Sequence, residues 1–511
     1  MLLHHFFQDT TRRQPDRIAL ACEGARLSWA DIAGEADRLA RCLHARGVRR
    51  GDRVALFLDN GWESVAGIHA VLSLGAVFMP VNPLTKRDKL AYLLADSRAS
   101  ALLTHAALSD AWAHAIAASP SVHTVVVASK EGASAPRPGG AIAWPDATSP
   151  PAEPVPDPGT IDQDLAAIIY TSGSTGDPKG VMLTHLNMVS AARSVSTYLG
   201  LREDDTIFCA LPLAFDYGLY QWLMATRTGA TVVLERSFAF PLKALEIMAR
   251  ERVTVFPGVP TMFSMLTATR GLDRFDLGAL RMITNTAAAL TEDHIRRLRG
   301  LFPQATLFSM YGLTECKRVT YLPPSQLDIR PTSVGRGMPN EEVWLVDDAG
   351  RRLPNGSTGE LVIRGSNVMR GYWEKPKETA ERLRPGPIPG EWVLHSGDLF
   401  RTDEEGWLYF VARKDDIIKS RGEKVSPKEV ENVLYAHEGI LEAAVVGVPD
   451  EVLGEAVKAF VVPREGHVLT EKEVIRHCLA RLESFMAPRH VAIVEALPKT
   501  DTGKIKKTGL A

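Results

Sequence analysis

The chain has 511 residues, of which 45% are hydrophobic and 23% are charged, and its formal net charge is −2 at pH 7. A single hydrophobic core rarely extends over this length, so the sequence predicts two or more domains. The composition is that of an ordinary globular protein. A nearly neutral chain has no bulk attraction for nucleic acid or for an anionic membrane, so neither is expected as a partner.

The five cysteines are scattered, and no two have the spacing of a metal site or a redox pair. They predict free thiols in a reducing compartment. The first residues contain two histidines and no basic leader before an apolar stretch, so no secretory signal is expected. The longest apolar segment, residues 67–81, is too short to span a membrane. These features predict a cytoplasmic enzyme.

Helical and extended patterns alternate through the N-terminal part. Helical periodicity covers residues 27–40 and 63–74, and strand-like apolar runs cover residues 52–58 and 76–81. A strand–helix–strand rhythm of this kind predicts the parallel sheets of an α/β fold. Residues 130–163 are rich in proline, glycine and alanine and lack apolar periodicity, so they predict a surface excursion rather than a domain boundary.

A loop rich in glycine, serine and threonine follows the apolar run of residues 165–169, which has the length of a strand. Glycines let main-chain N–H groups approach an anion, hydroxyls add donors, and a lysine adds positive charge. The Walker A pattern needs lysine directly after glycine, whereas Pro178 stands before Lys179 here. The loop is therefore either a surface turn or a phosphate-binding loop of another kind. Its candidate phosphate-binding residues are Thr171, Ser172, Gly173, Ser174, Thr175, Gly176 and Lys179.

Further motifs follow in order along the chain. They are Phe215-Asp216, Tyr311-Gly312-Leu313-Thr314-Glu315, Ser396-Gly397-Asp398, Arg413-Lys414-Asp415 and Thr502-Gly503-Lys504. With the loop at 170–180, they resemble the adenylate-forming superfamily, which includes acyl-CoA synthetases, adenylation domains of nonribosomal peptide synthetases and firefly luciferase. The resemblance covers nearly the whole chain. It implies a large domain of layered, mostly parallel sheets with helices, residues 1–414, and a small mobile α+β domain, residues 415–511.

The resemblance implies that these motifs bind ATP. Tyr311 would offer its ring face to adenine. Asp398 and Arg413 would bind the ribose, and Asn285 would lie in a turn along the adenine and the acyl pocket.

The resemblance also implies the catalytic groups. Thr314 would donate to the α-phosphate, and Glu315 would be an oxygen ligand of Mg²⁺. Lys504 would be the catalytic lysine of the small domain. Asp415 would be the hinge about which that domain rotates.

Asp216 is the residue from which the acid substrate is inferred. Amino-acid adenylation domains carry Phe-Asp at this place, and that aspartate pairs with the amino group of the substrate. A carboxylate in a largely apolar pocket is costly unless a cation meets it, and an ammonium group would do so. The alternative is that Asp216 caps a helix beginning near Tyr217. The predicted acid-binding residues are Phe215, Asp216, Tyr217, Tyr220, Met310 and Arg318.

Lys317 and Arg318 directly follow Glu315-Cys316. A Lys-Arg pair is usually part of a solvated surface. By its resemblance to amino-acid-activating relatives, Arg318 alternatively falls near the acid pocket, where it would meet a second carboxylate.

The implied reaction has two halves. A carboxylate attacks the α-phosphorus of ATP and expels pyrophosphate, and a thiol then attacks the acyl-adenylate and expels AMP. The sequence most resembles a free-standing amino-acid adenylation enzyme that loads the phosphopantetheine thiol of a carrier protein. The alternatives are a short- or medium-chain acyl-CoA synthetase that uses free CoA, a luciferase-like oxygenase, and a non-catalytic nucleotide-binding protein on the same fold.

Overall fold

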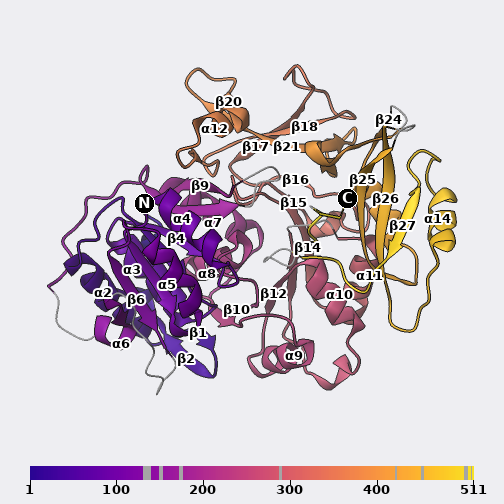
Figure 1. Ribbon diagram of the computed structural model, residues 1–511. Coiled ribbons are helices and arrows are strands. Elements are labelled where there is room, and N and C mark those ends of the chain that lie inside the picture. Colours follow the sequence, from indigo (N-terminus) through magenta and orange to yellow (C-terminus); the bar gives the residue numbers. More distant parts are fainter. Residues whose placement is uncertain are drawn as a thin grey trace.

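The computed structural model describes residues 1–129, 140–148, 153–171, 177–286, 290–420, 423–450, 454–499, 505–507 and 509–510. Within these ranges the strands form four sheets (Figure 1). Two large sheets and their helices make up most of the chain. A third sheet follows them in sequence, and a fourth belongs to the C-terminal unit.

The first large sheet contains the strands β1 (Ile18–Cys22), β2 (Ala25–Ser28), β10 (Thr206–Cys209), β11 (Thr231–Leu234), β12 (Val255–Gly258), β13 (Met282–Asn285), β14 (Thr306–Tyr311), β15 (Thr320–Leu322) and β16 (Arg336–Gly337). Their order is β16-β15-β14-β13-β12-β10-β11-β1-β2. The six strands from β14 to β1 run parallel, whereas β2, β15 and β16 are antiparallel additions at the edges.

The second large sheet contains β3 (Arg53–Phe57), β4 (Val77–Val81), β5 (Ala101–His105), β6 (Thr124–Ala128), β7 (Ile142–Ala143), β8 (Leu165–Thr171), β9 (Lys179–Thr184) and β19 (Gly371–Tyr372). Their order is β19-β9-β8-β4-β3-β5-β6-β7. The strands from β8 to β7 are parallel, and β9 and β19 are antiparallel.

The helices of the large unit are α1 (His4–Arg13), α2 (Trp29–Ala45), α3 (Trp62–Ser73), α4 (Arg87–Ser97), α5 (Ser109–Ala117), α6 (Trp144–Ala147), α7 (His185–Tyr198), α8 (Asp216–Thr228), α9 (Pro241–Arg250), α10 (Pro260–Ala268), α11 (Glu292–Leu301) and α12 (Pro376–Arg382). In α3 and α8, long runs of consecutive residues are buried. A helix that is apolar on all sides is covered on all sides. These two helices accordingly pack inside the main hydrophobic core, together with strands of both large sheets.

Alternation along β3 shows how the second sheet is covered. Val54 and Leu56 join the main core, whereas Ala55 and Phe57 join a separate core with α4 and α5. Successive strand residues point to opposite faces, so helices cover this sheet on both sides.

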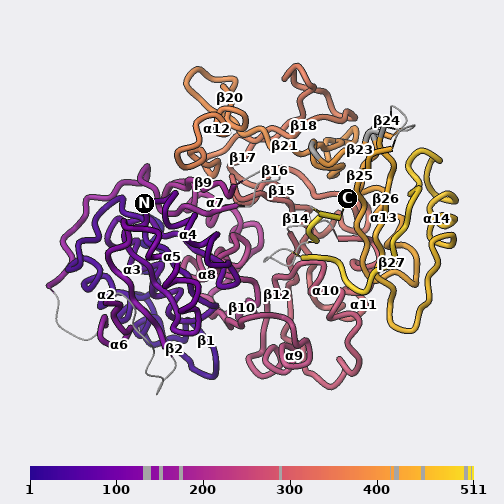
Figure 2. Tube along the Cα trace, in the orientation of Figure 1, coloured from indigo at the N-terminus to yellow at the C-terminus, as the bar shows by residue number. Residues whose placement is uncertain are grey.

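The remaining strands form two smaller sheets. The third sheet is antiparallel and contains β17 (Glu341–Val346), β18 (Thr358–Gly365), β20 (Leu383–Pro385), β21 (Trp392–Thr402) and β22 (Leu408–Arg413). The C-terminal unit contains β23 (Ile418–Ser420), β24 (Glu423–Val425), β25 (Ile440–Asp450), β26 (Gly454–Pro463), β27 (His490–Ile493), α13 (Pro427–Tyr435) and α14 (Glu471–Leu479). Figure 2 follows the chain from the orange third sheet into this yellow unit, which has its own hydrophobic core.

The predicted elements of the N-terminal part are confirmed. The helical patterns are α2 and α3, and the two apolar runs are β3 and β4, which pair in parallel. The α/β class with a smaller C-terminal unit is also confirmed. The boundary at residue 415 stays a prediction, although a short 3₁₀ turn, Lys414–Asp416, joins β22 to β23.

The excursion predicted at residues 130–163 has regular structure in its described part. It contributes the edge strand β7 and the one-turn helix α6, and Trp144 of that helix is buried. None of the helices in the described ranges is both long enough and apolar enough to cross a membrane. The five cysteines are all free thiols, as predicted.

Candidate active site

The residues singled out from the sequence gather at the carboxyl ends of parallel strands. Thr171, Asn285 and Tyr311 are the last residues of β8, β13 and β14. Strands β13 and β14 are neighbours, and Asn285 is the register partner of Ser309. Open α/β sheets bind ligands at this end of their strands, because the connecting loops there leave a crevice.

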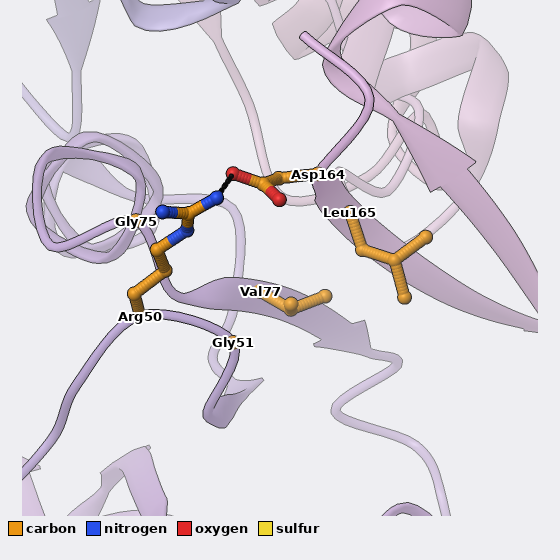
Figure 3. Close-up of a pocket in the computed structure, with 6 residues that line it drawn as sticks. All are labelled: Arg50, Gly51, Gly75, Val77, Asp164 and Leu165. Carbon is orange, nitrogen blue, oxygen red and sulfur yellow. Dashed lines mark ion pairs between the residues drawn. The ribbon is translucent and has the colours of Figure 1, made fainter. Parts of the chain in front are cut away.

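A hollow of about 310 Å³ lies at the opposite end of the second large sheet (Figure 3). It is lined by Val77 and Leu165, the first residues of β4 and β8. An ion pair of 2.7 Å between Arg50 and Asp164 crosses it. Because none of the predicted site residues lines this hollow, it is separate from the candidate active site.

The predicted phosphate loop begins and ends in a β-hairpin. Thr171 and Lys179 are register partners of the antiparallel strands β8 and β9. The Thr171 hydroxyl donates to the Lys179 carbonyl oxygen at 3.4 Å. The ends of the loop are thus held by the sheet, while Ser172, Gly173, Ser174, Thr175 and Gly176 lie outside the described residues.

The segment after β14 folds back tightly on itself at Gly312. A Cβ atom there would lie 2.4 Å from the Lys317 carbonyl oxygen and 2.9 Å from the Arg318 Cα atom. Only glycine fits this turn without moving the backbone. The turn places Thr314 and Glu315, both half-buried, beside the end of β14.

Tyr311 contacts the residue that was predicted to bind ribose. Its phenol donates to the Asp398 carboxylate at 2.6 Å, and Arg413 is the register partner of Asp398 on the next strand. Burial raises the pKa of Asp398, although the Tyr311 hydrogen bond and the Arg413 charge favour its ionised form. The Tyr311 ring packs against the Phe400 ring, with centroids 4.8 Å apart. The sequence therefore located three groups that the fold brings together.

Glu315 accepts a hydrogen bond from a tyrosine for which the sequence predicted no chemical role. The Tyr372 phenol donates to Glu315 Oε1 at 2.7 Å, and burial together with this carboxylate raises the pKa of Tyr372. Lys179 Nζ lies 5.7 Å from the centroid of the Tyr372 ring. Tyr372 therefore connects the loop after β8 to the turn after β14.

The surroundings of Glu315 fit the Mg²⁺ that the resemblance implies. One carboxylate oxygen is fixed by Tyr372, and the other is left as an oxygen donor. Mg²⁺ is commonly bound by one or two carboxylates together with substrate phosphates, rather than by a cage of protein ligands. In line with that pattern, no cluster of three or more His, Cys, Asp or Glu suited to a metal occurs in the described part of the chain.

Asp216 begins α8 and faces Lys317. The Lys317 Nζ atom donates to the main-chain oxygen of Asp216 at 2.8 Å and lies 3.6 Å from its Oδ2 atom. No side-chain hydrogen bond caps α8, whose N-cap residue is Phe215. The helix-cap alternative is therefore wrong, and the protein supplies a cation to this carboxylate.

The Lys317 ammonium lies among aromatic rings as well. Its Nζ atom is 4.5 Å from the Tyr220 ring centroid and 5.4 Å from the Tyr217 ring centroid. A carboxylate with two aromatic faces is a receptor for an organic cation. The predicted receptor for a substrate amine is thus occupied by a side chain of the protein. Burial lowers the pKa of Lys317 to about 7.

The surface interpretation of Lys317 and Arg318 is wrong, because both side chains are buried, with only 2% and 1% of each residue exposed. Arg318 lies over the Tyr217 ring, 5.0 Å from its centroid. The Tyr217 hydroxyl in turn is 2.8 Å from the Thr284 carbonyl oxygen, to which it donates. These contacts join the start of α8 to the end of β13.

The other predicted acid-binding residues lie nearby but differ in orientation. Met310 is buried beside Tyr198, whose hydroxyl is 2.9 Å from its sulfur. Neighbouring strand residues point to opposite faces, so Met310 points away from the side of β14 on which Tyr311 meets Asp398. Phe215 is partly buried against the main core.

Besides the residues of the phosphate loop, two more predicted residues cannot be placed in this site. Lys504 lies outside the described residues, and so does the side chain of Asp415. Two further residues of the site received no role from the sequence, namely Tyr372 and Lys317. Two features of the sequence could have pointed to them. Tyr372 stands in a Gly-Tyr motif, and Lys317 stands shortly before an apolar segment.

Comparisons with known proteins match almost the whole chain. A family model described as AMP-binding enzyme matches residues 7–373, and one described as AMP-binding enzyme C-terminal domain matches residues 429–504. A feruloyl-CoA synthase from Amycolatopsis sp. is 36% identical over 501 residues, which cover 97% of this chain and 96% of that protein.

Two further relatives differ in kind. Tyrocidine synthase 1 from Brevibacillus parabrevis is 29% identical over 514 residues, covering 99% of this chain and 44% of that protein. The ATP-bound structure of MatB from Rhodopseudomonas palustris superposes with a TM-score of 0.88 at 29% identity, covering 100% of this chain and 98% of the other.

Proposed function

The chain belongs to the AMP-binding enzyme family, and on that premise we propose that it joins a carboxylic acid without an amino group to coenzyme A. Members of this family activate an acid with ATP as an acyl-adenylate. The family therefore accounts for the ATP-dependent acid activation. The absence of an amine and the use of free CoA as acceptor are the proposal.

One observation carries the proposal. Asp216 was expected to pair with the ammonium group of an amino acid, and Lys317 already lies against it. A second ammonium at the same carboxylate would meet the Lys317 charge in a buried site, and like charges at short range repel strongly where water is excluded. An acid that lacks an amine avoids this repulsion.

The groups of the site then have distinct tasks in the first half-reaction. Tyr311 and Asp398 orient the nucleoside, and Thr314 donates toward the phosphate as charge builds on its oxygens. Mg²⁺, held by Glu315 and phosphate oxygens, would supply further charge neutralisation. In the second half-reaction a thiol attacks the adenylate carbonyl, so the protein needs no nucleophile of its own.

Amino-acid adenylation with transfer to a carrier protein is the second candidate. It is favoured by the similarity to tyrocidine synthase 1 along almost the entire chain. On this alternative, Lys317 would have to release Asp216 when the substrate binds.

ATP–pyrophosphate exchange separates the two candidates. The panel pairs each proteinogenic amino acid with its desamino acid, for example phenylalanine with 3-phenylpropanoic acid. We expect exchange with desamino acids only, and formation of the CoA thioester when CoA is added. Exchange confined to an amino acid, with loss in Asp216→Ala and transfer only to a phosphopantetheinylated carrier, would establish the second candidate instead.

A further inference from the structure

Arg318 has no counter-ion in the described part of the chain. Its Nε and Nη1 atoms are buried and have no hydrogen-bond partner there, and no ion pair includes it. Its close neighbour is the face of the Tyr217 ring. A guanidinium remains charged at all physiological pH values, so this site holds a buried positive charge that the protein leaves unpaired.

Two carboxylates, Asp216 and Glu341, each share a tyrosine neighbour with Arg318, and the described ion pairs join neither of them to it. Asp216 contacts Lys317. The Asn367 amide donates to Glu341 Oε1 at 3.3 Å and to the main-chain carbonyl oxygen of Arg318 at 3.1 Å. Glu341 Oε2 is buried and has no hydrogen-bond partner among the described residues. Burial raises the pKa of Glu341 well above its ordinary value.

The position of Arg318 places this charge on the acid side of the site. Arg318 follows the Gly312 turn that carries Thr314 and Glu315, and it contacts Tyr217 in the first turn of α8. A buried cation without a partner is strongly unfavourable, and a carboxylate that accepts two parallel hydrogen bonds from a guanidinium is its best complement.

We propose that the acid activated here is a dicarboxylic acid, whose distal carboxylate binds Arg318 while the other carboxylate reacts with ATP. This inference rests on the proposed function, and it narrows the substrate class from acids without an amine to acids with a second carboxylate. Arg318 is thereby a specificity-determining residue. Its task is to hold the distal anion and to disfavour acids that end in an uncharged group.

The test compares acids of equal chain length that differ at the distal end. Pyrophosphate exchange is measured with butanoic and butanedioic acid, hexanoic and hexanedioic acid, and benzoic and phthalic acid. We expect the kcat/KM ratio of diacid to monoacid to exceed one in wild type. We expect Arg318→Met to lower that ratio by about 10- to 100-fold, because one charge-assisted interaction is lost. Arg318→Lys retains a positive charge but lacks the planar guanidinium. Its diacid-to-monoacid ratio should lie between those of wild type and Arg318→Met.

A matched variant separates specificity from folding. Arg330 is a poorly exposed arginine paired with Asp403 and Glu405, and none of its described contacts involves the site. Arg330→Met should lower the melting temperature without changing the diacid-to-monoacid ratio. If Arg318→Met fails to fold, the ratio in Arg318→Lys decides the question.

The outcomes distinguish the inference from the function on which it rests. Exchange with monoacids at an unchanged ratio in both Arg318 variants would overturn the dicarboxylate inference and leave the CoA ligase proposal standing. A wild-type preference for monoacids would do the same, since it would show that the site does not require a second carboxylate. Exchange with amino acids alone, or with no acid, would overturn both.

Discussion

At the nucleotide side of the site, Asp398 and Glu315 each accept a hydrogen bond from a tyrosine, at 2.6 and 2.7 Å. At the acid side, Lys317 lies beside Asp216, and Arg318 has no ion-pair partner among the described residues. The nucleotide is the same in every reaction of the family, so its carboxylates can be fixed before it binds. The acid is the variable partner, and here the protein leaves a charge that the substrate must neutralise. Preorganised carboxylates on the nucleotide side suit the binding of a constant partner, and an unneutralised positive charge on the acid side suits the selection of a particular acid.

Loss of the predicted catalytic lysine tests the nucleotide side most severely. Lys504→Ala should lower adenylate formation by about 10³-fold, because a positive charge at the developing phosphate charge is lost. The transfer of a supplied acyl-adenylate to CoA should persist. Single-turnover assays of each half-reaction measure both. Equal loss in the two half-reactions would remove the specific role of Lys504 in adenylation.

Breaking the charge pair tests the acid side. Asp216→Asn or Lys317→Met alone should each lower the free energy of unfolding by about 3 kcal/mol, because each leaves a buried charge without its partner. The double variant should be more stable than the sum of the two losses predicts. Urea denaturation of the four proteins gives the coupling energy. Additive losses would mean that Asp216 and Lys317 do not interact.

Removal of one phenol should affect the two substrates unequally. Tyr311→Phe leaves the buried Asp398 without its 2.6 Å hydrogen bond. We expect the KM for ATP to rise by about tenfold, with little change in the KM for the acid. Tyr409→Phe is the matched control, because Tyr409 donates to Asp403 at 3.1 Å in the same sheet. An equal rise in both KM values would place Tyr311 on both sides of the site.

The last prediction is a pH dependence of stability at the acid side. The folded-state pKa of Lys317, about 7, lies below its ordinary value of 10.5. Between these values the unfolded chain binds more protons than the folded one, so stability gains from this group as pH rises. Below pH 7 the free-energy cost of burying the charged Lys317 ammonium is fully present.

The double variant Asp216→Asn/Lys317→Met provides the reference for this effect. The stability of wild type relative to that variant should rise by about 3 kcal/mol between pH 7 and 10. Urea denaturation at each pH measures it. A difference that stays flat or falls would mean that Lys317 keeps an ordinary pKa.

The motif residues on the nucleotide side could be predicted from the sequence because their chemistry is local. The Gly312 turn, with Thr314 and Glu315, is encoded within a few residues, and the strands before the loops have clear apolar runs. The convergence of Tyr311 with Asp398, 87 residues apart, followed from resemblance alone. No role was predicted for Tyr372, because nothing in the residues around it indicates that it donates to Glu315, 57 residues away.

The sequence by itself determined the α/β class, the order of the elements and the family, and it supplied the prediction of which groups bind ATP, because periodicity and short motifs encode them. Only the tertiary structure decided how charge is arranged around the acid. Lys317 reaches Asp216 across 101 residues, and the fold buries a Lys-Arg pair that reads as surface, with Lys317 beside Asp216 and Arg318 without an ion-pair partner among the described residues. Counter-ions and burial are properties of neighbours in space, and a linear pattern does not specify them.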